Sequence, residues 1–123
     1  MHHEFYFDGN KDSISWAIQT EDSIVKENRK HAEIYRDKIT NLQSKYVALH
    51  VGLFWGIGVS IIKNRDSLKV MCDEKIIHHN ITTISKIEDD FIAKKIGFIK
   101  QLIIQRELKT EFEVISYKKN LST

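Results

Sequence analysis

The feature that most restricts the fold is a stretch without formal charge that extends from residue 46 to residue 62. Within it, Gly52 and Gly56 have the small-xxx-small spacing found where membrane helices pack together. The stretch is at the bottom of the range of about 17 to 25 residues that a membrane-spanning helix needs, and it contains His50 and Ser60. A helix buried under a sheet has the same pattern, and the rest of the chain favours that interpretation.

Short alternating segments and helical segments follow one another in an order typical of an α/β protein. The segment 4–7 is aromatic and extended, and it ends at the turn signal Asp8-Gly9-Asn10, which predicts the first strand. Alternation predicts further strands, and helical spacing with capping residues at Thr40 or Asn41 predicts helices. These elements are strands 13–18, 23–25, 67–72 and 111–115 and helices 41–57, 74–79 and 88–107. The order β-β-β-α-β-α-α-β predicts a mixed sheet with helices packed on it.

The composition is that of one globular domain over residues 1–123. Hydrophobic residues make up 41% and charged residues 29%, and the absence of proline leaves no mark of a linker. The single cysteine, Cys72, has no partner for an internal disulfide, which predicts a small buried thiol in a reducing compartment. Nothing near the N-terminus resembles a signal peptide, so we expect an intracellular, cytoplasmic protein.

Four stretches resemble the ribonuclease H family in the order that its type 1 fold has them. They are Phe5–Gly9, Thr40–Leu53 with its Tyr-x-Ala-Leu and Gly-Leu, Leu68–Asp73, and Val114–Asn120. The resemblance covers nearly the whole chain and implies an α/β fold, with a mixed five-stranded sheet, helices packed on it, and the family's terminal helix missing. Members of this family cut the RNA strand of RNA–DNA hybrids, using clustered carboxylates that hold two divalent cations.

By this resemblance, Asp8 and Asp73 are the catalytic and metal-binding acids, and Glu74 is a further candidate metal ligand. The same resemblance places Lys45 where the family has a glutamate, and it places the family's last acid a few residues beyond Asn120. Asp8, Asp73 and Lys45 together carry a net charge of −1, too little to offset two divalent cations. We therefore predict a degenerate site in which Lys45 pairs with Asp8, Asp73 or both.

Other conspicuous residues have a simpler structural interpretation. The pairs His2-His3 and His78-His79 could suggest a metal site. Neighbouring side chains on a helix point about 100° apart and cannot easily join one site, so we expect these histidines at the surface or in a tail. The acidic run 88–90 is expected to cap the helix that follows it. Aromatic residues of the kind that stack on bases are also present, but two of them lie on the apolar helix and are predicted in the core. The four are Trp16, Tyr117 and, on that helix, Phe54 and Trp55.

We predict from these features a domain that binds without cutting. The expected partner is an RNA–DNA hybrid or another nucleic-acid duplex, or else a protein, with no membrane and no cofactor, and with Mg²⁺ or Mn²⁺ needed only if the chain is active. Basic residues gather between 94 and 119, although a solvated helix face accounts for them better than a phosphate-binding surface does. The candidate nucleic-acid-binding residues are Asn10, Lys94, Lys95, Lys118 and Lys119.

Two other functions stay open. One is an active metal-dependent ribonuclease H that recruits Glu74 or Asp12 as a substitute carboxylate. The other is a protein-interaction or inhibitor subunit that keeps the fold without the site.

Overall fold

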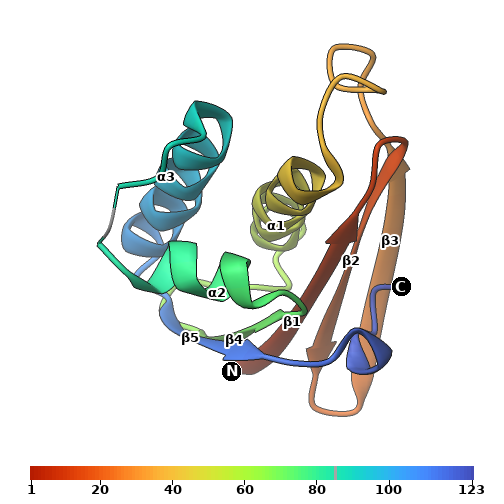
Figure 1. The fold of residues 1–123 in the computed structure, drawn as a ribbon. Coiled ribbons are helices and arrows are strands. Elements are labelled where there is room, and N and C mark those ends of the chain that lie inside the picture. The colour runs from red at the N-terminus through yellow and green to blue at the C-terminus, as the bar shows by residue number, and fades with distance from the viewer. Residues whose placement is uncertain (85) are drawn as a thin grey trace.

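In the computed structural model, which describes residues 1–84 and 86–123, a five-stranded sheet carries helices on one face (Figure 1). The strand order is β3-β2-β1-β4-β5. Antiparallel pairing joins β1 (His2–Gly9) to β2 (Ser13–Thr20) and β2 to β3 (Ser23–Lys30). Parallel pairing joins β1 to β4 (Ser67–Cys72) and β4 to β5 (Lys109–Val114). The predicted α/β fold with a mixed sheet is confirmed.

The helices lie in the connections that lead to the parallel strands, where the chain must cross over the sheet. Helix α1 (Asn41–Gly58) connects β3 to β4, and α2 (Lys75–Thr82) and α3 (Asp90–Gln105) connect β4 to β5. After β5 the chain forms the short 3-10 turn η1 (Tyr117–Lys119). No helix among the described residues is long and apolar enough to cross a membrane.

Helix α1 is central because one of its sides is apolar and meets the aromatic face of the sheet. Gly52 allows the close approach, since a Cβ at this position would lie 2.7 Å from ring atoms of both Phe5 and Trp16. The core prediction was wrong for Phe54, which is 64% exposed, and Trp55 is only partly buried. The reason is that residue 54 lies on the side of α1 that turns away from the sheet.

Strand β3 is longer than its sequence predicted. The expected strand ended at residue 25, but pairing with β2 continues to Lys30, which lies opposite Ser13. The prediction failed because the second half of β3 is charged, whereas apolar alternation was the signal used. β3 is an edge strand of the sheet, where exposed charged side chains are tolerated and discourage pairing with another chain.

Polar caps hold the N-termini of α1 and α3 together. Thr40 and Gln43 form a capping box at the start of α1. Asp89 caps α3 by accepting from the Ile92 amide at 3.1 Å, as predicted for the acidic run. The Gln43 side chain also donates to Asp89 at 3.0 Å, so one amide group links both caps.

The prediction of surface histidines was wrong for His3. Its ring is fully buried, with Nε2 at 2.7 Å from the Asp66 carboxylate and Nδ1 at 2.6 Å from the Thr20 hydroxyl. His78 lies beside β5, where its Nε2 contacts the Phe112 carbonyl at 3.1 Å. Cys72 is fully buried, as expected for a structural thiol, and burial raises its pKa to about 12.

Candidate functional site

Two neighbouring parallel strands bring Asp8 and Asp73 to the same edge of the sheet. Asp8 is the second-last residue of β1, and Asp73 follows the last residue of β4. The register pairs Tyr6 with Met71, so the two aspartates lie two residues further along adjacent strands. The strand ends therefore assemble the pair of acids that the sequence pointed to.

Helix α1 brings Lys45 to these acids because Gly9 of β1 contacts the helix at Ser44, the residue before Lys45. A Cβ at Gly9 would overlap the Ser44 side chain and lie 2.7 Å from its carbonyl group, so only glycine permits this contact. The buried ring of His31 fixes the junction, with Nε2 at 2.7 Å from the Ser44 hydroxyl and 3.0 Å from the Asn10 carbonyl oxygen. This arrangement sets the distance between the end of β1 and the second turn of α1.

The ammonium group of Lys45 lies among three carboxylates. Its Nζ is 3.1 Å from Asp73, 3.3 Å from Glu74 and 3.6 Å from Asp8. Burial alone would lower the pKa of Lys45, but the hydrogen bond and charge of Asp73, followed by the charges of Glu74 and Asp8, raise it above its ordinary value. Lys45 is therefore held as a cation. The predicted pairing with Asp8, Asp73 or both is confirmed, and both aspartates take part.

Asn120 completes the cluster from the far end of the chain. Its amide nitrogen donates to the second oxygen of Asp73 at 3.0 Å and to the Phe7 carbonyl at 2.9 Å. The Asp73 side chain is fully buried, and both of its oxygens are engaged by Lys45 and Asn120. In the sequence, Asn120 only marked the end of the last matching stretch, and no role was predicted for it. The one signal for its role was its position just after the last strand.

The side chains as arranged do not fit a two-cation centre. One Asp8 oxygen accepts from the Gly9 amide at 2.8 Å and also faces Lys45, while Asp73 has no free oxygen. Among the described residues, no group of three or more His, Cys, Asp and Glu side chains is placed to hold a metal ion. A divalent cation at this point would have to displace the ammonium of Lys45.

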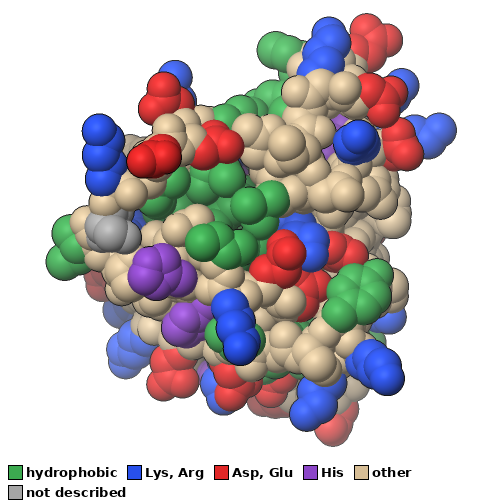
Figure 2. Space-filling model, viewed as in Figure 1, with side chains coloured by type: hydrophobic (Ala, Val, Ile, Leu, Met, Phe, Trp, Pro, Cys, Tyr) green, Lys and Arg blue, Asp and Glu red, His purple; other side chains and the backbone are tan. Residues whose placement is uncertain are grey.

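The cluster opens into a pocket of about 330 Å³ at the surface. Figure 2 shows acidic side chains gathered around a basic one between α2 and η1. The pocket is lined by Asp8, Gly9, Asn10, Asn41, Leu42, Lys45, Glu74 and Tyr117. Asn10, a candidate nucleic-acid-binding residue, lies here. Tyr117, which the sequence did not place at the site, also lines the pocket.

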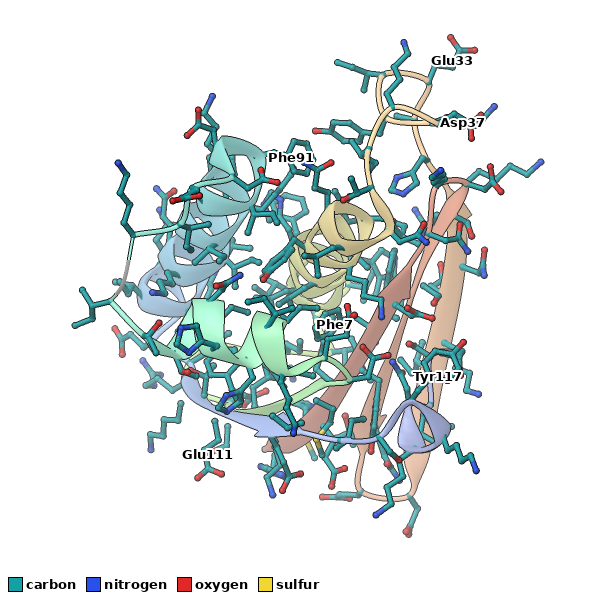
Figure 3. All side chains as sticks on the ribbon, in the orientation of Figure 1. Phe7, Glu33, Asp37, Phe91, Glu111 and Tyr117 are labelled. Carbon is teal, nitrogen blue, oxygen red and sulfur yellow. The ribbon has the colours of Figure 1, made fainter. Side chains whose placement is uncertain are left out.

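The candidate lysines fall into two separate groups. Lys118 and Lys119 are exposed on η1, next to Tyr117 at the pocket. Lys94 and Lys95 lie on α3, which packs against α1 far from η1, as the positions of Phe91 and Tyr117 in Figure 3 show.

Lys95 is further set apart by an aromatic environment. Its Nζ lies 5.5 Å, 5.7 Å and 6.0 Å from the ring centres of Tyr35, Phe91 and Phe98. This ammonium contributes cation–π contacts within the protein. The basic segment between 94 and 119 therefore does not form one continuous surface.

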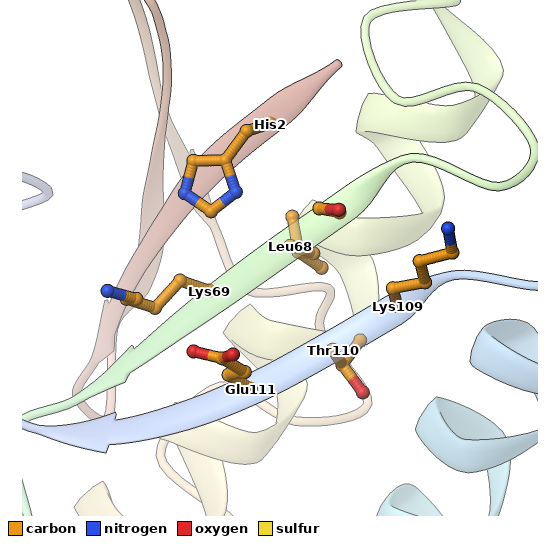
Figure 4. A pocket seen from close by; sticks show the side chains of 7 residues that line it. His2, Leu68, Lys69, Lys109, Thr110 and Glu111 are labelled. Atoms are coloured by element: carbon orange, nitrogen blue, oxygen red, sulfur yellow. The ribbon is translucent and has the colours of Figure 1, made fainter.

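Of the two candidate substitute acids, only Glu74 lies at the cluster. Asp12 is in the β1–β2 turn and lines a different hollow with Lys30 and Arg36. A larger hollow of about 410 Å³ lies over β1, β4 and β5, where His2, Lys69 and Glu111 project from the strands (Figure 4). Its charges are mixed, and it shares no residue with the pocket at Lys45.

The sheet order, the connecting helices and the acids at adjacent strand ends define a ribonuclease H-like fold. No protein-family model and no curated protein sequence matches this chain. Solved structures do match it. Ribonuclease H1 from the halophilic archaeon Halobacterium salinarum NRC-1 is similar with a TM-score of 0.80 and 17% identity, over 100% of this chain and 92% of that one.

Two further structures extend the likeness. The N-terminal ribonuclease H domain of rv2228c from Mycobacterium tuberculosis has a TM-score of 0.79 and 14% identity, over 100% of this chain and 93% of that one. LC11 ribonuclease H1, in complex with an RNA/DNA hybrid, has a TM-score of 0.70 and 16% identity, over 98% of this chain and 88% of that one. These matches confirm the predicted ribonuclease H-like fold across the whole chain, and at such identities they speak for the fold alone.

Proposed function

We propose that this chain is a ribonuclease H-like domain that binds a nucleic-acid duplex, an RNA–DNA hybrid foremost, without cutting it. The observation that carries the proposal is the Lys45 ammonium within 3.6 Å of three carboxylates. The fold supports binding, because a protein of the same fold, LC11 ribonuclease H1, has been solved with an RNA/DNA hybrid.

Electrostatics is the reason to expect no cleavage. Three carboxylates and one ammonium give the cluster a net charge of −2, and Lys45 already neutralises the acid that is most deeply buried. At an effective dielectric constant near 20, a cation about 4 Å from a carboxylate gains about 4 kcal/mol, and an ammonium at that distance repels it comparably. An incoming Mg²⁺ would have to break the contact between Lys45 and Asp73 before it could bind the Asp73 carboxylate itself.

Phosphate contacts are assigned to groups around the pocket rather than within it. Lys118 and Lys119 are exposed on η1, the turn whose Tyr117 lines the pocket, and Asn10 offers an amide at the rim of the pocket. Such contacts release counterions from the duplex, so affinity should fall steeply as salt is raised.

Cleavage and binding of a labelled RNA–DNA hybrid, with Mg²⁺ and with Mn²⁺, test the proposal directly. The unaltered chain should bind the hybrid and leave it intact. Lys45→Glu should gain metal affinity, seen as a rise in melting temperature with metal concentration. Lys26→Glu makes the same charge change on an exposed residue of β3 and should gain none. Cutting by the unaltered chain would overturn the non-cleaving assignment.

The alternative nuclease rests on one observation, the place of Glu74. Its carboxylate lies 3.3 Å from Lys45 and its side chain is 42% exposed, so it is the acid most accessible to a metal ion. If the unaltered chain does cut, Glu74→Gln should abolish the cleavage and Asp12→Asn should leave it unchanged. If neither cleavage nor duplex binding occurs, a protein-interaction role takes precedence.

A further inference from the structure

Tyr117 is an exposed aromatic ring placed at the edge of the candidate site. It lines the pocket together with Asp8, Lys45 and Glu74, yet 59% of its surface is accessible to solvent. Figure 3 shows it on η1, away from α2. A single exposed ring is ordinary on a protein surface, so its role depends on what fixes it and what surrounds it.

The turn that carries Tyr117 is anchored to the buried cluster. The Asn120 amide N–H donates to the Tyr117 carbonyl at 3.0 Å, and the Lys119 amide donates to Ser116 at 3.0 Å. The Asn120 side chain is buried and bonded to Asp73 and Phe7. The ring is therefore presented from a backbone that is fixed before any ligand arrives, which lowers the entropy lost on binding.

The surroundings of the ring match the chemistry of a nucleotide. Lys118 and Lys119 follow it directly in the sequence and are exposed, so cations for the phosphates lie on the same short turn as a face for the base. Aromatic rings next to a basic surface are the combination with which proteins hold unpaired strands. Inside the pocket the net charge of −2 disfavours a phosphate, whereas a neutral base can offer N–H donors to Asp8 and Glu74.

We propose that Tyr117 is a stacking platform for one unpaired nucleotide that adjoins the bound duplex, with its base at the pocket and its phosphates at Lys118 and Lys119. The nucleotide must be unpaired, because the faces of bases inside a duplex are already covered by their neighbours. This inference rests on the proposed duplex binding and adds to it a preference for a strand end.

The test compares the affinity of the unaltered chain for blunt RNA–DNA hybrids and for hybrids with a short 5′ or 3′ overhang, at one fixed salt concentration. An overhang should tighten binding by about five-fold or more, the effect of one stacked base. Tyr117→Ala should remove this gain and Tyr117→Phe should keep it. Phe54→Ala, at an exposed ring on α1 that does not line the pocket, should also keep it.

The outcomes separate the two proposals. Binding of blunt hybrid with no gain from any overhang, or with a gain that survives Tyr117→Ala, overturns the stacking role and leaves duplex binding standing. Failure to bind any of the hybrids overturns the duplex proposal, and the stacking role with it. The melting temperature of Tyr117→Ala, which should equal that of the unaltered chain, excludes misfolding as the cause of a lost gain.

Discussion

The ammonium group of Lys45 offsets the mutual repulsion of three neighbouring carboxylates, because it attracts each of them. In its absence Asp8, Asp73 and Glu74 would face one another without a counter-charge, and Asp73 would be a fully buried carboxylate held by a single amide. Removing one partner of a buried ion pair leaves the other charge uncompensated, which is more damaging than losing the pair as a whole. The same ammonium therefore stabilises the buried carboxylates and occupies the position that a cation bound to them would need.

Lys45→Met should lower the free energy of unfolding by about 3 kcal/mol, because the buried Asp73 charge loses its counter-ion. Adding Asp73→Asn to Lys45→Met should recover part of this loss, since the charge is then removed. Urea unfolding of the two single variants and the double variant measures the coupling. Strictly additive losses would show that the pair does not interact.

Asp66 should make the domain acid-sensitive. Burial alone would raise the pKa of this carboxyl, but hydrogen bonds from His3, the Lys63 amide and the N-terminal ammonium lower it from 3.8 to about 2. A depressed folded-state pKa adds stability above the unfolded value, and this stability is lost as pH falls from about 4 toward 2. The shift corresponds to about 2 kcal/mol. Asp66→Asn should therefore flatten the change in unfolding free energy between pH 4.5 and pH 2.5.

At the level of elements, the contact of α1 with β1 and β2 decides where the site residues sit. Two glycines on opposite sides of that contact, Gly9 and Gly52, meet the neighbouring element at distances that leave no room for a methyl group. Gly97 on α3, by contrast, faces open space. Substitutions at Gly52 and Gly97 therefore measure two different effects, which are close packing at Gly52 and intrinsic helix propensity at Gly97.

Gly52→Ala should destabilise the domain by about 1 to 3 kcal/mol, because its methyl group would push α1 away from the rings of Phe5 and Trp16. Gly97→Ala should stabilise it by about 0.5 to 1 kcal/mol, since alanine loses less backbone freedom in a helix. Denaturant midpoints of both variants provide the measurement. A stabilising Gly52→Ala would mean that the helix can shift without loss.

The elements differ in how far their sequence could predict them. Strand β4 was predicted to the residue, because polar and apolar residues alternate from Ser67 to Val70 and the apolar run ends at Asp73. Strand β3 was predicted too short, because an outer strand needs little apolar character. Helix α1 was recognised from its lack of charge and from Thr40, yet the pattern did not reveal that Phe54 faces solvent.

The site was predictable only where its residues belong to a local motif. Asp8, Asp73 and Lys45 each sit in a stretch that resembles a known pattern, and their charges sufficed to predict the ion pair. Asn120 and His31 were missed, because single polar residues in turns have no periodicity and their partners lie far away in the sequence. Tyr117 was noted as an aromatic residue, but its place at the pocket follows only from the fold.

Across the whole molecule, charge is nearly balanced, and its arrangement matters more than its sum. Nineteen basic and seventeen acidic residues leave a formal net charge of +2, while the cluster at Lys45 is locally negative. A duplex should therefore be held by cations that flank this cluster. Those on η1 are better placed than those on α3.

Lys118→Glu combined with Lys119→Glu should weaken hybrid binding at least ten-fold, at roughly 1 kcal/mol or more per lost phosphate contact, and should reduce its dependence on salt. Lys94→Glu reverses an equally exposed charge on α3 and should change affinity by less than about two-fold. Binding isotherms at several salt concentrations measure both quantities. An equal effect of Lys94→Glu would place the duplex across α3 instead.

The Asn120 amide has a further consequence for how the molecule is made. It bonds to the Phe7 carbonyl across 113 positions of sequence, so β1 leaves the ribosome long before its last partner is synthesised. Until residue 120 has been made, the second oxygen of Asp73 lacks its hydrogen bond from Asn120. A chain that stops short of residue 120 should therefore leave the buried Asp73 carboxylate with one hydrogen-bond partner fewer.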